Sequence, residues 1–289
     1  MQLLTEGGID RLTLTGKFDC QNSCDYLRQM LYQSEGFRFN SFGMYKYNLK
    51  ITGFDNEDFS ALLQWGGDMY NIKLSWRLEI SPKNFNPYIK SIINKLYHLS
   101  TVNSLPKITR VDIAVDYLKN INELEIIYKK MGKWSTWGNG LQIETKNFGS
   151  RSSENYYRFY DKALEQGING NITRFEKEDK KGYSLEEIKA VDFENIFDDF
   201  IIIEKDSFED IVKDKEDFDI IDIALFDYLN KNPLKYSGLT RRQKERYKKA
   251  KEIFALSEGK EISIKPNNIA IQYELMNLIS WCGVYDYCL

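Results

Sequence analysis

Residues 147–166 read NFGSRSSENYYRFYDKALEQ and gather three tyrosines among basic side chains. Alternate residues of a β-strand face the same way, so one face would carry Tyr156, Arg158, Tyr160 and Lys162. Tyr157 and Phe159 would face the other way and pack inward. A phenol has an ordinary pKa of about 10 and needs help to attack phosphorus at neutral pH. Nearby cations favour the phenolate, and a divalent metal can polarise the phosphate that it attacks. Two roles stay open: a strand that packs rings and pairs charges, or a tyrosine that attacks a phosphodiester.

Three further segments each place an acid two residues after a cation: Arg77 and Glu79, Arg110 and Asp112, Arg174 and Glu176. As strands, all three pairs would project from one polar sheet face. On such a face, charged residues of neighbouring strands commonly form salt bridges with one another. Carboxylate oxygens also suit a hard divalent cation such as Mg²⁺ or Mn²⁺. Asp116 shares a face with Asp112. At ~3.3 Å per residue the two stand roughly 13 Å apart, too far to bind one ion directly.

Composition excludes several other chemistries. The chain of 289 residues has one histidine, His98, which rules out metal sites built on a histidine pair. It has no nucleophile-elbow, phosphate-loop or dinucleotide-binding motif. Four cysteines in a chain of this length favour a reduced, cytoplasmic protein. No apolar run of transmembrane length and no signal-peptide pattern is present, so we expect no membrane partner.

The elements that would position these residues predict an α+β fold. Alternating patterns predict strands over 8–18, 69–82, 108–118, 140–149, 155–162 and 172–178, and two more over 37–54 around a turn at Gly43. Helical spacing predicts helices over 20–33, 87–99 and near 123–132, and residues 60–65 resemble a short link. This order predicts a curved, mostly antiparallel sheet with helices on one face, followed by a mainly helical C-terminal region.

Charge divides the C-terminal part of the chain. Residues 186–219 hold fourteen acids against four lysines, and residues 241–251 hold seven cations and one acid. Both segments are expected to be helical, with Thr240 as the N-cap of the second and Gln243 at its third position. The basic helix is either a solvated face with Glu245 as an internal partner or a phosphate-binding element. Its candidate phosphate contacts are Arg241, Arg242, Lys244, Arg246 and Lys248.

The ordered motifs TRVDIAVDY, FGSRSSENYYRFYDKALEQ and TRFEKE resemble the Rep_trans family of rolling-circle replication initiators. The resemblance covers about residues 9 to 180. It implies that Tyr160 becomes linked to a 5′ phosphate, and that Asp112, Glu176 and, as a weaker match, Glu79 hold the metal. The family uses no histidine pair for its metal. Phe148 stands where the family usually has a tyrosine.

We therefore predict a metal-dependent initiator that nicks one DNA strand at an origin through a 5′-phosphotyrosyl intermediate and later religates it. Residues 1–183 would form the nicking domain, and residues 184–289 would serve origin recognition or dimerisation. Tyr156 is the alternative nucleophile. The expected phosphate contacts near the nick are Arg151, Arg158, Lys162, Arg110 and Arg174. Expected partners are DNA, a host helicase and polymerase, and a second copy of the chain. Alternatives are a relaxase, a non-catalytic DNA-binding regulator, and an interaction protein built on the acidic segment.

Overall fold

The computed structural model describes residues 7–39, 44–52, 59–67, 72–82, 85–101, 105–130, 133–139, 142–205, 224–225, 228–229, 238–255 and 262–282. Its contacts form two units. One contains Val115–Lys177 and Glu194–Lys265, and the other contains Gly7–Ala114, Glu178–Phe193 and Pro266–Leu289. The chain therefore passes between the units several times. The functional division into residues 1–183 and 184–289 stays a prediction.

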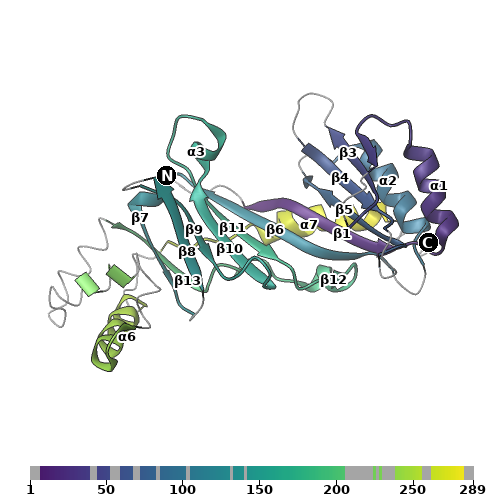
Figure 1. The fold of residues 1–289 in the computed structure, drawn as a ribbon. Coiled ribbons are helices and arrows are strands. Elements are labelled where there is room, and N and C mark those ends of the chain that lie inside the picture. The colour runs from purple at the N-terminus through teal and green to yellow at the C-terminus, as the bar shows by residue number, and fades with distance from the viewer. Residues whose placement is uncertain are drawn as a thin grey trace. The chain divides into compact units, whose positions relative to one another are not determined.

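In its described residues, the unit that begins at Gly7 combines antiparallel strands with helices (Figure 1). Its strands are β1 (Gly8–Lys17), β2 (Phe37–Phe39), β3 (Tyr47–Thr52), β4 (Phe59–Trp65), β5 (Ser75–Ile80), β12 (Tyr183–Ser184) and most of β6 (Lys107–Tyr117). Its helices are α1 (Gln21–Leu31), α2 (Pro87–His98) and α7 (Asn268–Trp281), with the short helix η4 (Glu187–Ala190). On β5, Trp76, Leu78 and Ile80 are buried while Arg77 and Glu79 face the other side, as the alternation predicts.

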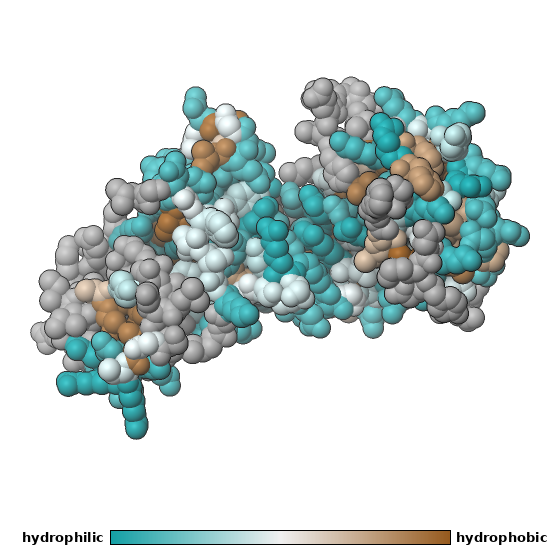
Figure 2. Space-filling model, in the orientation of Figure 1, coloured by the Kyte–Doolittle hydropathy of each residue, from teal (hydrophilic) through white to brown (hydrophobic). Residues whose placement is uncertain are grey.

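The unit that contains Val115–Lys177 is built around aromatic side chains. It holds η3 (Ile121–Glu123), β7 (Leu124–Tyr128), β8 (Trp134–Asn139), β9 (Gln142–Phe148), β10 (Asn155–Asp161), α3 (Lys162–Gln166), β13 (Phe200–Glu204) and most of β11 (Thr173–Asp179). Phe148, Phe159 and Phe200 lie 4.7 to 5.3 Å apart by their ring centroids. Figure 2 shows a small hydrophobic patch at α3, among hydrophilic residues, where Leu164 and Ile168 are exposed.

The predicted α+β class with a largely antiparallel sheet is confirmed. The main sheet runs in the order β2-β3-β4-β5-β1-β6-β11-β10-β9-β8, β12 pairs with β6, and β13 and β7 form a separate two-stranded sheet. β1 lies between β5 and β6, with Thr13 opposite both Glu79 and Arg110. This order makes β6 and β11, which carry the predicted acids, neighbours.

Four local expectations are wrong. Residues 60–65 belong to strand β4 rather than a link, because they pair with both β3 and β5. Residues 124–128 form strand β7 rather than a helix, because they pair with β13. Strand β8 was not expected at all. Within the acidic segment, residues 200–204 form β13 rather than a helix, and residues 206–219 lie outside the described part of the chain. In each case strand pairing decides the structure, and local sequence does not reveal it.

The basic segment is helical as predicted. Helix α6 spans Arg241–Ala255. The Gln243 amide donates to the Thr240 hydroxyl at 3.3 Å, and the Thr240 amide donates to the Gln243 side chain at 2.9 Å, which is the predicted capping pair. Elsewhere, Cys20, Cys24 and Cys282 are free thiols, and His98 is exposed at the end of α2. Within the described residues, no helix is long and apolar enough to cross a membrane.

Candidate functional site

Strand β10 separates its side chains as the alternation predicts. Tyr157 and Phe159 pack on Phe200, with ring centroids 4.9 and 4.7 Å away. Tyr160 extends to the opposite face, where Arg158 lies with its guanidinium carbon 4.3 Å from the centre of the Tyr160 ring. The apolar face anchors the strand and thereby fixes the phenol on the polar face.

Tyr160 is buried against charged groups. Its side chain is 5% exposed, and the Lys162 ammonium lies 5.7 Å from its ring centre, further than the Arg158 guanidinium. Cations over an aromatic face are attracted to it, more strongly where water is excluded. Two basic side chains therefore lie close to the Tyr160 ring.

Burial raises the pKa of the Tyr160 phenol above its ordinary value, and the negative charge of Glu176 raises it further. Arg158 lowers this pKa, but the other two effects outweigh it. The sequence-based expectation that nearby cations favour the Tyr160 phenolate is therefore wrong, because the pKa is raised overall. The desolvation cost of the anion exceeds the attraction of the neighbouring guanidinium.

Arg158 connects Tyr160 to an acid. It donates to Glu176 on β11 over 2.9 Å, and the Glu176 carboxylate is almost fully buried. Burial lowers the pKa of the Arg158 guanidinium, but Glu176 outweighs that and raises it overall. Arg158 thus touches the candidate nucleophile and a candidate metal ligand at once.

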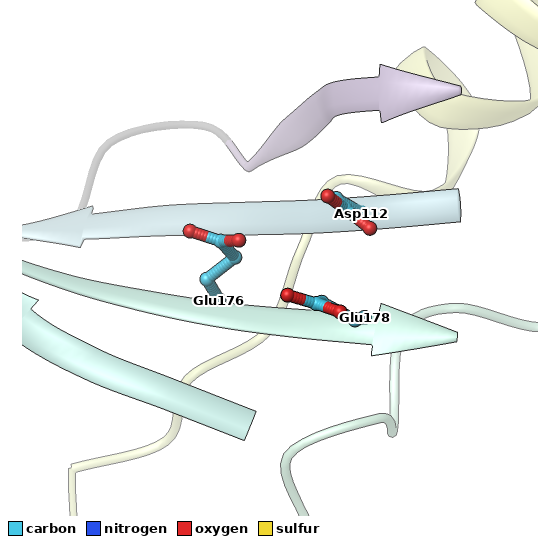
Figure 3. Close-up of side chains that lie close together, drawn as sticks. All are labelled: Asp112, Glu176 and Glu178. Atoms are coloured by element: carbon cyan, nitrogen blue, oxygen red, sulfur yellow. The ribbon is translucent and has the colours of Figure 1, made fainter. Parts of the chain in front are cut away.

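Glu176 belongs to a group of three carboxylates with Asp112 and Glu178 (Figure 3). Each offers an oxygen, and these oxygens lie within 4.8 Å of one another. Asp112 comes from β6, and both glutamates come from the neighbouring β11, where they are two residues apart and share a face. An all-oxygen set with two buried members is the donor chemistry that Mg²⁺ and Mn²⁺ prefer.

Basic side chains neutralise part of this charge. Arg110 donates to Asp112 through its Nε over 2.6 Å and lies 3.1 Å from Glu178. Lys180 pairs with Glu178 over 2.6 Å. The predicted alternative of salt bridging on a sheet face is therefore present too. A divalent ion would share its ligands with these cations.

Glu79 lies outside this group. It accepts from Arg77 over 2.6 Å and from Arg11 over 2.9 Å. Arg11 stands directly opposite Asp112 in the pairing of β1 with β6. Strand β1 therefore separates the strand of Glu79 from the strand of Asp112.

Two other predicted residues have defined partners. Arg174 makes a two-pronged bond to Asp116 on the neighbouring strand β6, at 2.5 and 2.7 Å. Tyr156 donates from its hydroxyl to Asn147 over 2.7 Å and, like Tyr160, is nearly buried.

The remaining predicted DNA contacts lie at the surface or in ion pairs. Arg151 is exposed in the turn before β10, and Lys162 pairs with Glu165 over 2.5 Å. On α6, Arg241 pairs with Glu245 over 2.9 Å. The other basic residues predicted there are exposed or half-buried: Arg242, Lys244, Arg246 and Lys248.

Glu178 is the site residue that the sequence prediction missed. The signal was present, because Glu176 and Glu178 alternate on one strand after Arg174. Glu178 shares a strand face with Arg174 and Glu176, but no cation precedes it by two residues, so it lies outside the pattern of a cation followed by an acid.

The chain was compared with known families, curated proteins and solved structures. No protein-family model matches it, and no curated protein sequence does. Among solved structures it is similar to a rolling circle replication initiator protein from Geobacillus stearothermophilus, at 19% sequence identity and a TM-score of 0.36. The match covers 61% of this chain and 74% of that chain. A likeness at this level carries no argument about activity, so a functional conclusion depends on the geometry of the site itself.

Proposed function

We propose that this chain is a metal-dependent DNA strand transferase that initiates rolling-circle replication. The observation that carries the proposal is the arrangement around Glu176. This carboxylate joins two others in a potential cation site and, through Arg158, adjoins the Tyr160 phenol. The motif resemblance assigns the same tyrosine, Asp112 and Glu176 to nicking.

In the proposed reaction, the Tyr160 hydroxyl oxygen attacks a DNA phosphorus, and the bond from phosphorus to the 3′ oxygen breaks. The phenol proton passes to solvent base, and the departing 3′ oxygen takes up a proton. The products are a 5′-phosphotyrosine and a free 3′ hydroxyl that can prime synthesis. Religation reverses the step: the 3′ hydroxyl attacks the phosphotyrosine and frees the phenol. One phosphodiester is exchanged for another, so no nucleotide triphosphate is consumed.

Each side chain has a distinct part in this proposal. Asp112, Glu176 and Glu178 would hold Mg²⁺ or Mn²⁺, which when bound polarises the phosphate. Arg158 orients the Tyr160 ring and offsets negative charge as the phosphorus is attacked. The cations of α6, Arg151 and Lys162 would contact phosphates beyond the nick.

The deciding experiment looks for the covalent intermediate. The full chain is incubated with Mn²⁺ and a pool of labelled single-stranded oligonucleotides with a random central sequence, then run on a denaturing gel. We expect a protein-linked label that resists denaturation and maps to Tyr160 by mass spectrometry of the linked peptide. Tyr160→Phe keeps the ring over which Arg158 lies, so it should fold normally and yield no linked label.

Other outcomes would point elsewhere. Oligonucleotide binding without cleavage, equal in the wild type and in Tyr160→Phe, would indicate a DNA-binding regulator and refute the nickase. Absence of salt-sensitive DNA affinity would favour an interaction protein instead, because phosphate contacts predict a steep fall of affinity with salt. A relaxase performs the same chemistry at a transfer origin, and the sequence of the preferred nick site separates it from a replication initiator.

A further inference from the structure

Strand β8 presents a large aromatic side chain to solvent. Trp137 is 67% exposed, although it lies in a strand that pairs with β9. The strand is the last in the order of the main sheet. Exposed tryptophan costs hydrophobic free energy that burial would recover, so its position calls for a partner.

Trp137 shares a sheet face with the candidate nucleophile. It stands directly opposite Thr145 on β9, and Thr145 stands directly opposite Tyr160 on β10. Directly opposed residues project from the same face. The three residues therefore form one row across three strands, and two strand spacings put the backbones of Trp137 and Tyr160 roughly 10 Å apart.

Polar side chains form the next row of this face. Arg158 stands opposite Asn147, and Asn147 stands opposite Ser135. The Asn147 amide is 3.4 Å from the Ser135 hydroxyl and accepts from Tyr156. An exposed ring beside hydroxyl and amide groups can meet both the flat face and the polar edge of a nucleotide base.

The backbone of β8 has a bulge directly after Trp137. The pairing of β8 with β9 shifts register between Trp137 and Gly138. A Cβ at Gly138 would lie 2.0 Å from the Gln142 carbonyl oxygen, so only glycine fits. Bulges of this kind redirect neighbouring side chains and end regular pairing.

We propose that Trp137 stacks on an unpaired base of single-stranded DNA that continues to the phosphate at Tyr160. The choice of ligand rests on the proposed function. Every base has a flat π-face, so stacking on Trp137 would hold the strand without choosing its sequence. At 3.4 Å per stacked nucleotide, ~10 Å corresponds to about three nucleotides, or fewer if the strand is extended.

A second copy of the chain is the competing occupant, since an edge strand can pair with another edge. The bulge at Gly138 interrupts the regular row of backbone groups that such pairing needs. The strand also carries polar side chains, Ser135, Thr136 and Asn139, and all three are exposed. These features favour a nucleic-acid strand over a second sheet.

The test measures affinity for oligothymidine of about twelve nucleotides, within the range covered by single-strand-binding sites. Fluorescence anisotropy is recorded on the full chain carrying Tyr160→Phe, so that no covalent bond forms. Adding Trp137→Ala should weaken binding about 5- to 160-fold, the loss of one stacked base, and Trp137→Phe should restore most of it. The slope of log affinity against log salt should not change, because no phosphate contact is removed.

The matched control is Tyr273→Ala on α7, an aromatic residue with 69% exposure, which should leave affinity unchanged. Unchanged affinity in Trp137→Ala would overturn the inference. The inference would also be overturned if Trp137→Ala changed only the monomer–dimer equilibrium, measured by sedimentation. That result would assign the surface to a second copy of the chain. If the wild type forms no adduct but Trp137→Ala still weakens oligothymidine binding, stacking stands and nicking alone fails.

Discussion

Glu178 and Glu79 provide a direct test of the cation site. Oxygen ligands of Mg²⁺ at about 2.1 Å stand roughly 3 Å apart when adjacent and about 4 Å apart when opposite. The oxygens of Asp112, Glu176 and Glu178 lie within 4.8 Å of one another, so small side-chain rotations would close the set. Glu79 is held by Arg77 and Arg11 instead. We therefore expect Glu178→Gln to weaken Mn²⁺ binding and Glu79→Gln to leave it unchanged.

The size of the effect follows from linkage. At a Mn²⁺ concentration 100 times the wild-type dissociation constant, binding stabilises the folded chain by about 2.7 kcal/mol. If loss of one carboxylate weakens binding tenfold, the same concentration gives about 1.4 kcal/mol. A rise in Tm of about 5 to 11 °C should then fall to about half. Differential scanning fluorimetry with and without Mn²⁺ measures both, and each variant is compared with its own metal-free Tm.

Two results would refute this reasoning. If Glu178→Gln keeps the full Mn²⁺-induced rise, the carboxylate group is only an ion-pair network with Arg110, Arg158 and Lys180. If Glu79→Gln and Glu178→Gln lose the rise equally, the metal lies elsewhere and Arg11 must move away from Glu79 when it binds.

Three further predictions concern the nucleophile and the DNA surface. Tyr156→Phe removes the hydrogen bond to Asn147, so we expect the free energy of unfolding to fall by about 0.5–1.5 kcal/mol. The covalent adduct should still form on a denaturing gel. Loss of the adduct would make Tyr156 the nucleophile. The pKa of Tyr160 is raised by burial and by Glu176, so the phenol is protonated near neutral pH and the single-turnover nicking rate should rise about tenfold per pH unit from pH 7 to 9; a flat profile would show that proton loss does not limit the reaction. The raised pKa of Tyr160 also contributes to the free energy of unfolding. This contribution is fully present below the ordinary tyrosine pKa of about 10 and is lost as pH rises through the raised pKa of the folded state. Replacing Arg242, Lys244 and Lys248 on α6 with glutamine should flatten the slope of log affinity against log salt by about 0.9 for each cation that contacts a duplex phosphate; an unchanged slope would mean that α6 faces solvent or protein.

Sequence alternation predicted the faces of the strands well. Trp76, Leu78 and Ile80 are buried while Arg77 and Glu79 face the other way, and β10 divides into an apolar and a charged face. These results follow from the two-residue period of a strand, which is a local property. The capping pair of Thr240 and Gln243 was predictable for the same reason.

Partners across strands could not be predicted in the same way. The sequence indicated salt bridges between strands on this face but not which residues form them, because residues two apart on a strand compete with residues on neighbouring strands for the same partner. Strand order decides the outcome, and here Asp116 accepts both bonds from Arg174 while Arg158 pairs with Glu176. A single sequence contains the charges but not the order of strands that pairs them.

The same limit explains why the electrostatics of Tyr160 were misjudged. The sequence displays three nearby cations, Arg151, Arg158 and Lys162, and from these alone a lowered phenol pKa follows. Folding buries the ring and brings Glu176 from another strand, and both changes oppose ionisation. Since Glu176 is also a member of the carboxylate group, an ion bound there would offset the charge that now disfavours the phenolate.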